Sequence, residues 1–313
     1  MYLDKLNYKI VMWLIMISNV LSLLFFLALG YLINRKIDLK RLKIFIKWFL
    51  VYLGIPGIVL CSLLSFDVPM ADLKVISAAV TISLFINMLF SFMGNRVLGL
   101  KDKGVFILLI SFPNSGFLGL PICYVLFGDL GLYYASIYVL MCTIIHYTIG
   151  LFFSLQSEFK DIKYALHGVG RFPVVYSMGA VLLLITLDLD LPGAVLSSLD
   201  YLGEVTSFLA VFYIGMSLEL YKDKSMKKLI MNTTYVGSFR FFILPLVMFL
   251  LCVYFKIEPK ILVLESMMPP AIANTVLAAH YSMNKELCAN ITTILTVAFI
   301  ITFFLLFELV SYV

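Results

Sequence analysis

Charged residues are scarce in this chain. They make up 13% of its 313 residues, whereas soluble domains carry about 25%. Hydrophobic residues reach 63% and the mean hydropathy is +1.06, so there are too few polar side chains to cover a water-soluble surface. The composition therefore excludes a soluble protein and predicts an integral membrane protein.

The motifs of common enzyme classes are missing as well. The sequence contains no HExxH, GxSxG or Walker A pattern and no pair of aspartates within an apolar run that would form a catalytic dyad. Its three histidines are dispersed and its five cysteines lack metal-ligand spacing. We therefore expect no catalytic residue, metal or cofactor, and reduced cysteines packed among apolar neighbours. The basic residues lie in short gaps between apolar runs, which argues against nucleic-acid binding.

What the chain does have is a series of apolar runs near the roughly 20 residues that a membrane-crossing helix needs. Ten such spans can be drawn, joined by short connections. Numbered 1 to 10, they run approximately over residues 12–33, 43–65, 75–97, 104–127, 130–154, 172–187, 199–220, 229–255, 261–281 and 287–312. The sequence predicts one all-α integral membrane unit with no soluble domain between the spans.

Lysine and arginine predict how the spans are oriented. Seventeen of the 23 lie in or beside the gaps after odd-numbered spans, and five lie in the N-terminal tail and the remaining gaps. Because cytoplasmic gaps are enriched in basic residues, we expect the odd-numbered gaps in the cytoplasm and both termini outside the cell membrane. The last basic residue, Arg240, lies inside span 8, where its long side chain could snorkel to the headgroups.

The two halves of the chain match at a constant offset of 157 residues. Spans 1–5 then map onto spans 6–10, Lys103 maps onto Lys260, and Pro113 maps onto Pro270. Because five is an odd number, the second unit must enter the membrane from the opposite side. We therefore predict inverted repeats over residues 1–157 and 158–313, the usual construction of secondary transporters.

Spans 4 and 9 each contain residues that interrupt a helix. Residues 111–121 (SFPNSGFLGLP) and 268–275 (MPPAIANT) combine proline with Asn, Ser, Thr or Gly, and a proline inside a helix removes a backbone hydrogen bond. Matched breaks at membrane depth point to a substrate site. We expect eight residues to form it: Pro113, Asn114, Ser115, Gly116, Pro121, Pro270, Asn274 and Thr275.

A broken helix offers chemistry that suits an anion. The half-helix after the break begins with free N–H groups and a partial charge of about +0.5. Asn114 and Asn274 can add amide donors without a permanent charge, a combination that would hold a carboxylate and still release it. The alternative is that the two asparagines only satisfy carbonyl groups freed by the kinks.

These motifs resemble those of the auxin efflux carrier family. The run from Pro113-Asn114-Ser115 to Gly119-Leu120-Pro121 is similar to the family's PN[ST]xxxGxP segment, and the Met-Pro-Pro-Ala run after Glu265 is similar to its second broken helix. Residues 53–57 (LGIPG) and 213–218 (YIGMSL) also agree. The similarity covers essentially the whole chain without the long cytoplasmic loop of plant members, so the chain resembles a short prokaryotic member.

The resemblance implies a fold and a function. The fold would have ten transmembrane helices in two inverted five-helix repeats, with helices 4 and 9 broken and crossing. Spans 1, 2, 6 and 7 would form a scaffold, through which a homodimer would fit, and the other six a moving transport unit. The function would be secondary transport of a small organic carboxylate, such as auxin or a dicarboxylate, by alternating access. The alternatives are a Na+- or H+-coupled symporter of the bile acid carrier type, or a membrane sensor that does not transport.

Two further ionisable side chains lie within the spans. In the sodium-coupled relatives an acid in a similar place helps to hold sodium, so Glu265 would bind a coupling Na+ or proton, with Ser115 and Thr275 supplying oxygen ligands. Alternatively, Glu265 lies close enough to the membrane surface to stay hydrated. His146 in span 5 could relay protons, but a hydrogen-bonded packing role is favoured.

Overall fold

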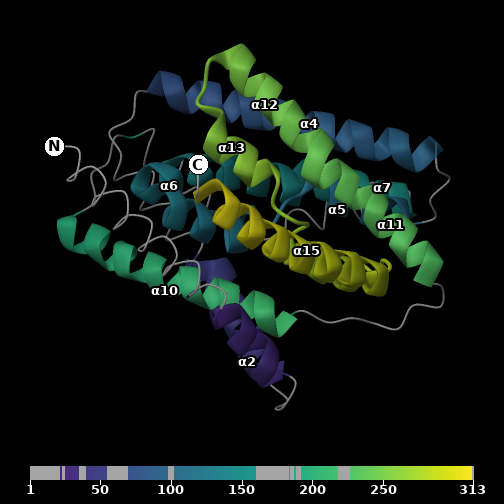
Figure 1. Ribbon diagram of the computed structural model, residues 1–313, viewed down its shortest axis with the longest axis horizontal. Coiled ribbons are helices and arrows are strands. Elements are labelled where there is room, and N and C mark those ends of the chain that lie inside the picture. The colour runs from purple at the N-terminus through teal and green to yellow at the C-terminus, as the bar shows by residue number, and fades with distance from the viewer. Residues whose placement is uncertain are drawn as a thin grey trace.

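The computed structural model is helical throughout its described part (Figure 1). It describes residues 22, 25–34, 40–54, 70–97, 102–159, 183, 187, 192–217 and 226–311. Within these residues the helices are joined by one isolated β-bridge and no β-strand. The all-α prediction is confirmed for this part of the chain. Nearly all of span 6, residues 55–57 and Cys61 lie outside the described residues, and the ten-helix count stays a prediction.

The described chain begins with a helix over Phe25–Asn34. The elements that follow are α2 (Lys40–Phe49), η1 (Leu50–Gly54), α4 (Met70–Val97), α5 (Lys103–Ser111), η2 (Ser115–Gly119), α6 (Leu120–Ile145), η3 (His146–Gly150), α7 (Leu151–Phe159), α10 (Gly193–Ser217), α11 (Met226–Ser238), η4 (Phe239–Ile243), α12 (Leu244–Phe255), α13 (Pro259–Ser266), α14 (Ile272–His280) and α15 (Lys285–Ser311). The four η segments are single π-helical turns.

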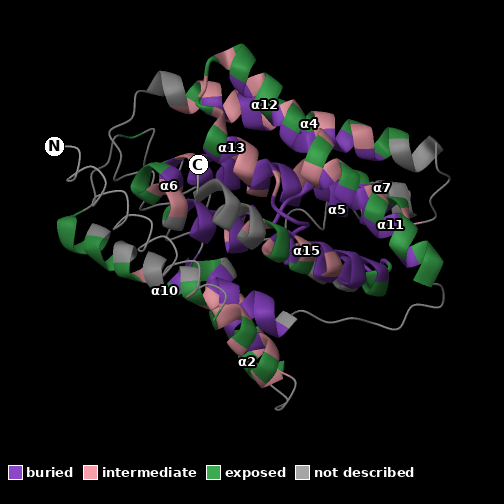
Figure 2. Cartoon of the chain, viewed as in Figure 1, coloured by how far each residue is buried: buried purple, intermediate pink, exposed green. Residues whose placement is uncertain are grey.

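Four helical stretches in the described residues are long and apolar enough to cross a membrane: Leu73–Met93, Leu126–Leu155, Met226–Phe255 and Lys285–Phe303. They correspond to predicted spans 3, 5, 8 and 10. The outward faces of α4 and α12 expose large apolar side chains, while the inward faces are buried (Figure 2). This distribution is the one expected of a protein embedded in a bilayer.

Spans 4 and 5 meet at a sharp turn within α6. Gly128 has φ 61° and ψ −146°, which separates the helical residues before it from those after it. Glycine adopts this backbone conformation without the steric penalty that a Cβ would bring. The predicted boundary between residues 127 and 130 is confirmed.

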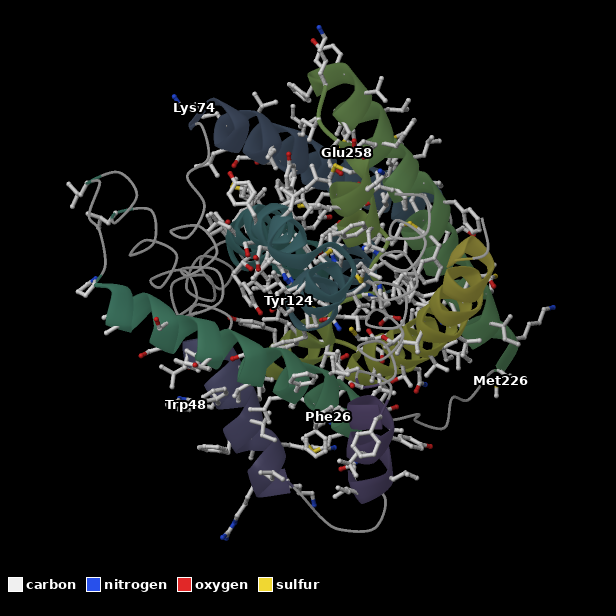
Figure 3. The ribbon with its side chains drawn as sticks, turned by 60° about the vertical axis from the view of Figure 1, so that its left-hand side comes forward. Phe26, Trp48, Lys74, Tyr124, Met226 and Glu258 are labelled. Carbon is white, nitrogen blue, oxygen red and sulfur yellow. The ribbon has the colours of Figure 1, made fainter. Side chains whose placement is uncertain are left out.

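Two clusters of buried apolar side chains join the helices. The larger one, the inner core, is shared by α4 to α7 and α11 to α15. The smaller one, the boundary cluster, joins α2, η1 and α10 to η2, α6, α14 and α15. In Figure 1 α2 and α10 lie below the other helices. Figure 3 shows Phe26 and Trp48 on this side of the molecule, opposite Lys74 and Glu258.

Glycines allow α10 to approach its neighbours closely. A Cβ on Gly215 would lie 2.0 Å from the main-chain oxygen of Leu27, and a Cβ on Gly54 would lie 2.6 Å from Cγ2 of Thr206. Both distances are far inside van der Waals contact. Gly54 and Gly215 belong to the segments at residues 53–57 and 213–218 that carry the family resemblance, and here they serve helix packing.

Candidate functional site

The two broken helices contact each other at their breaks. Residues 112–114 separate α5 from η2, and residues 267–271 separate α13 from α14. Within these segments, Pro113 and Pro270 form an isolated antiparallel β-bridge. The predicted breaks in spans 4 and 9 are confirmed, and the residues around this bridge are called the crossover below.

Two main-chain hydrogen bonds flank the bridge. The N–H of Asn114 donates to the carbonyl of Pro269 at 2.7 Å, and the N–H of Ala271 donates to the carbonyl of Phe112 at 3.1 Å. The two halves of the chain are offset by 157 residues, so Asn114 corresponds to Ala271 and Phe112 corresponds to Pro269. Exchanging corresponding residues therefore converts each of the two hydrogen bonds into the other. A local two-fold axis through the bridge would relate them in this way.

Asn274 ties α14 to α5. It has no exposed surface, and its Nδ2 donates to the carbonyls of Leu108 and Phe112 at 2.9 and 3.2 Å. These carbonyls belong to the end of α5, where a helix leaves carbonyl groups without intrahelical partners. Both amide hydrogens of Asn274 are therefore used within the protein, as the alternative interpretation of this residue expects.

Asn114 is held differently. Its main chain is fully engaged, because the N–H bonds to Pro269 and the carbonyl accepts from Leu118 and Gly119. Its side chain is 2% exposed and caps no helix, and Nδ2 has no partner among the described residues. Asn114 thus presents an unused amide donor at the N-terminal end of η2.

The other predicted site residues are distributed along the same two spans. Ser115 is buried and Gly116 is half-buried in η2, directly after the bridge, and Pro270 forms the bridge itself. Pro121 lies in the first turn of α6, where its missing N–H is tolerated. Thr275 is directed toward α15, because its Oγ1 donates to Sγ of Cys288 at 3.7 Å. The structure therefore brings six of the eight residues to the crossover and places Pro121 and Thr275 further along.

Glu265 is buried beside η2. Its Oε1 accepts a hydrogen bond from Sγ of Cys123 at 3.4 Å, and its Oε2 has no partner among the described residues. A Cβ on Gly119 would lie 2.2 Å from Oε2, so the glycine leaves room for the carboxyl group. The suggestion that Glu265 stays hydrated near the membrane surface is wrong, because it has no exposed surface. An ionised carboxylate at this place would require a cation.

Arg240 lies at the crossover, a position that the sequence interpretation did not predict. The prediction that the Arg240 side chain snorkels to the headgroups is wrong, since the residue has no exposed surface. Its Nη1 donates to the carbonyl of Ile110 at 2.8 Å, its Nη2 to those of Ser266 and Met268 at 2.8 and 2.6 Å, and its Nε to Met268 at 3.0 Å. The guanidinium therefore joins the last turn of α5 to the end of α13.

His146 packs against the crossover. Its ring stacks on Phe112 with centroids 4.1 Å apart and planes 8° from parallel. Gly150 permits this arrangement, because a Cβ there would lie 2.1 Å from the ring of Phe112. Nε2 of His146 has no partner in the described part of the chain. The buried, stacked ring is consistent with the packing role that the sequence favours, and a proton relay through His146 stays a hypothesis.

Three π-helical turns carry these residues. Ser115 lies in η2, His146 in η3 and Arg240 in η4. Such turns are frequent at functional sites. The sequence offers a signal for η4, since Pro245 follows it and lacks the N–H that a continuous α-helix would use. Pro121 follows η2 at the same spacing, whereas no proline follows η3 in α7.

Comparison with known proteins supports the family suggested by the motifs. A family model described as "Membrane transport protein" matches residues 15–165 and 163–307. The uncharacterized transporter MJ1031 of Methanocaldococcus jannaschii is 28% identical over 215 residues, which cover 66% of this chain and 69% of that protein. The uncharacterized transporter YfdV of Escherichia coli is 23% identical over 212 residues, 64% of this chain and 66% of its own. The chain therefore belongs to the membrane transport protein family, that of the auxin efflux carriers, and is a membrane-embedded transporter.

Proposed function

We propose that the protein is a secondary carrier that moves a small organic carboxylate across the cell membrane by alternating access. In this proposal ten spans form two inverted repeats, with both termini outside. The helices around the inner core move against a scaffold that contains α2 and α10. The substrate binds at the crossover.

The observation that carries the proposal is the unused amide of Asn114. It is buried at the N-terminal end of η2, and α14 begins at the same bridge. Each helix N-terminus offers free N–H groups and about +0.5 of partial charge. A carboxylate placed there would accept hydrogen bonds from donors that otherwise have no partner, which offsets the loss of its hydration.

Two features support alternating access. The main-chain hydrogen bonds donated by Asn114 and Ala271 are equivalent when residues 157 apart are matched, as inverted repeats would require. In addition, the boundary cluster between α2 and α10 and the remaining helices consists of apolar side chains. Apolar packing has little directional preference, so such a boundary allows packed helices to slide.

Coupling to an ion is the second candidate function, and Glu265 favours it. Export of a monovalent anion needs no coupling, since the membrane potential favours it by about 2.3 kcal/mol per 100 mV. Uptake of the same anion would need Na+ or H+. The unpartnered Oε2 of Glu265 is then the place for a proton or a cation.

Transport by the purified protein in liposomes tests the proposal. Counterflow of labelled malate, malonate and indole-3-acetate would be measured with and without a sodium gradient. We expect flux of one anion in the wild type and its loss in Asn114→Ala. Asn87→Ala is the matched control, because Asn87 is also a buried amide without a partner in the described residues but lies on α4, outside both breaks.

Three results would count against the proposal. Flux that survives Asn114→Ala would move the substrate site away from this amide. Equal losses in Asn114→Ala and Asn87→Ala would mean that the site is not specific to the crossover. The absence of flux for all three anions would argue against a carboxylate carrier and favour a sensor.

A further inference from the structure

Arg240 lies where the carbonyl ends of two half-helices meet. Ile110 is in the last turn of α5, Ser266 is the last residue of α13, and Met268 lies two residues beyond it. All four hydrogen bonds of the guanidinium end on the main-chain oxygens of these residues, at 2.6 to 3.0 Å. One side chain from span 8 thus holds spans 4 and 9 together at their breaks.

The charge of Arg240 is met by helix ends. In the described part of the chain, no Asp or Glu forms an ion pair with it. An isolated charge would be very costly at this depth. However, each helix C-terminus carries a partial charge of about −0.5, so the ends of α5 and α13 together offset about one positive charge. The partial charges of these two helix ends can therefore offset the charge of Arg240 on the carbonyl side of the crossover.

Carbonyl oxygens at half-helix C-termini are the ligands with which carriers of broken-helix design coordinate sodium, because hard cations prefer oxygen. Here these oxygens are already bound by a guanidinium, which keeps its proton under all physiological conditions. We propose that Arg240 is a built-in cation that takes the place of an alkali-metal ion at the crossover. The two broken helices then stay joined, and the carrier cycles, without Na+ at these oxygens.

In this role Arg240 is a positioning residue, since it acts through α5 and α13 and not on the substrate. The part that concerns the transport cycle rests on the proposed function. The part that concerns helix joining does not, and can be measured without any substrate. The experiments below keep the two apart.

The first experiment uses the unmodified protein. Its thermal unfolding in detergent would be followed in NaCl, KCl and choline chloride at equal ionic strength. We expect the same melting temperature in the three salts. A rise specific to Na+ that persists in Glu265→Gln would overturn the proposal, because it would show that a sodium ion still binds and stabilises the fold away from the carboxyl group of Glu265.

The second experiment removes the built-in cation. In Arg240→Ala we expect a lower melting temperature, which millimolar methylguanidinium or Na+ raises again because either can enter the vacated place. Arg41→Ala is the matched control, since Arg41 on α2 is exposed and its loss removes the same charge. Neither additive should raise the melting temperature of the control or of the wild type. Failure of both additives in Arg240→Ala would overturn the proposal, and if that variant cannot be purified the salt series decides.

Flux measurements separate this inference from the proposed function. If Arg240 is a built-in cation, wild-type counterflow is equal in Na+ and choline, and Arg240→Ala lowers the counterflow rate roughly tenfold or more. Counterflow that still requires Na+ in Glu265→Gln would overturn the built-in cation while leaving the carrier in place. Absence of counterflow for every anion would overturn the carboxylate carrier, while the melting temperatures would still report on Arg240.

Discussion

Replacing Asn274 with alanine tests the side-chain hydrogen bonds that join the two broken helices. Its Nδ2 donates to the carbonyls of Leu108 and Phe112 at 2.9 and 3.2 Å. Each carbonyl keeps a main-chain donor in the variant, because Phe112 N–H donates to Leu108 and Ala271 N–H donates to Phe112. The variant therefore loses two neutral hydrogen bonds but leaves neither carbonyl wholly unpaired.

The expected magnitude follows from that count. A neutral hydrogen bond contributes about 0.5–1.5 kcal/mol in proteins, and interhelical ones in a membrane average about 0.6 kcal/mol. Asn274→Ala should lower the free energy of unfolding by about 1–3 kcal/mol. At about 2–4 °C per kcal/mol for chains of 150–250 residues, the melting temperature should fall by several degrees. Asn114→Ala breaks no described side-chain hydrogen bond, so its melting temperature should stay close to that of the wild type.

Thiol reactivity provides the assay. Cys123, Cys142, Cys252 and Cys288 are free and buried, so a thiol-reactive dye should label them as the protein unfolds on heating. The expected order of melting temperatures is wild type and Asn114→Ala together, with Asn274→Ala several degrees lower. If Asn114→Ala melts below Asn274→Ala, then hydrogen bonding does not distinguish the two asparagines and the argument for a free donor at Asn114 is refuted.

Two glycine substitutions test close contacts. Gly119→Ala places a Cβ 2.2 Å from Oε2 of Glu265, so the carboxyl group must move, and we expect a loss of about 1–3 kcal/mol in unfolding free energy together with reduced flux. Gly193→Ala is the control, because an added Cβ there meets open space. Equal melting temperatures and equal flux in Gly119→Ala and Gly193→Ala would contradict the predicted clash with Glu265. In Gly215→Ala the new Cβ would lie 2.0 Å from the main-chain oxygen of Leu27, so the first span must separate from α10 and the melting temperature should fall. An unchanged melting temperature would show that this contact is absent in solution.

The breaks and the turn at Gly128 could be predicted because their causes are local. Proline removes an N–H wherever it stands, and glycine permits a positive φ. Pro113 and Pro270 therefore marked the crossover in advance, and spans 4 and 5 were separated at the right place. The contact between the two breaks depends on residues that are distant in sequence, and it was indicated by the 157-residue offset and by the family resemblance, which implied that helices 4 and 9 cross.

The roles of Asn274 and Arg240 depend on partners that are distant in sequence. Asn274 donates to a carbonyl 166 residues away, and Arg240 to one 130 residues away, so spacing along the chain carries no sign of either bond. For Arg240 the usable signal was its distance from the ends of the apolar stretch that contains it. It lies 14 residues inside Met226–Phe255, about 21 Å along a helix, which is too far for a snorkelling side chain. Glu265 also proved to be buried, since its surroundings come from η2 and α6.

The π-helical turn at η4 also affects how relatives at 23% and 28% identity can be compared with this chain. A π-turn holds one residue more than an α-turn, so each residue after it is rotated by about 100° relative to an uninterrupted helix. A relative without this turn would align with a one-residue gap somewhere in Phe239–Ile243. Where that gap is placed decides whether Arg240 is matched with a residue that faces the broken helices or with one that faces lipid.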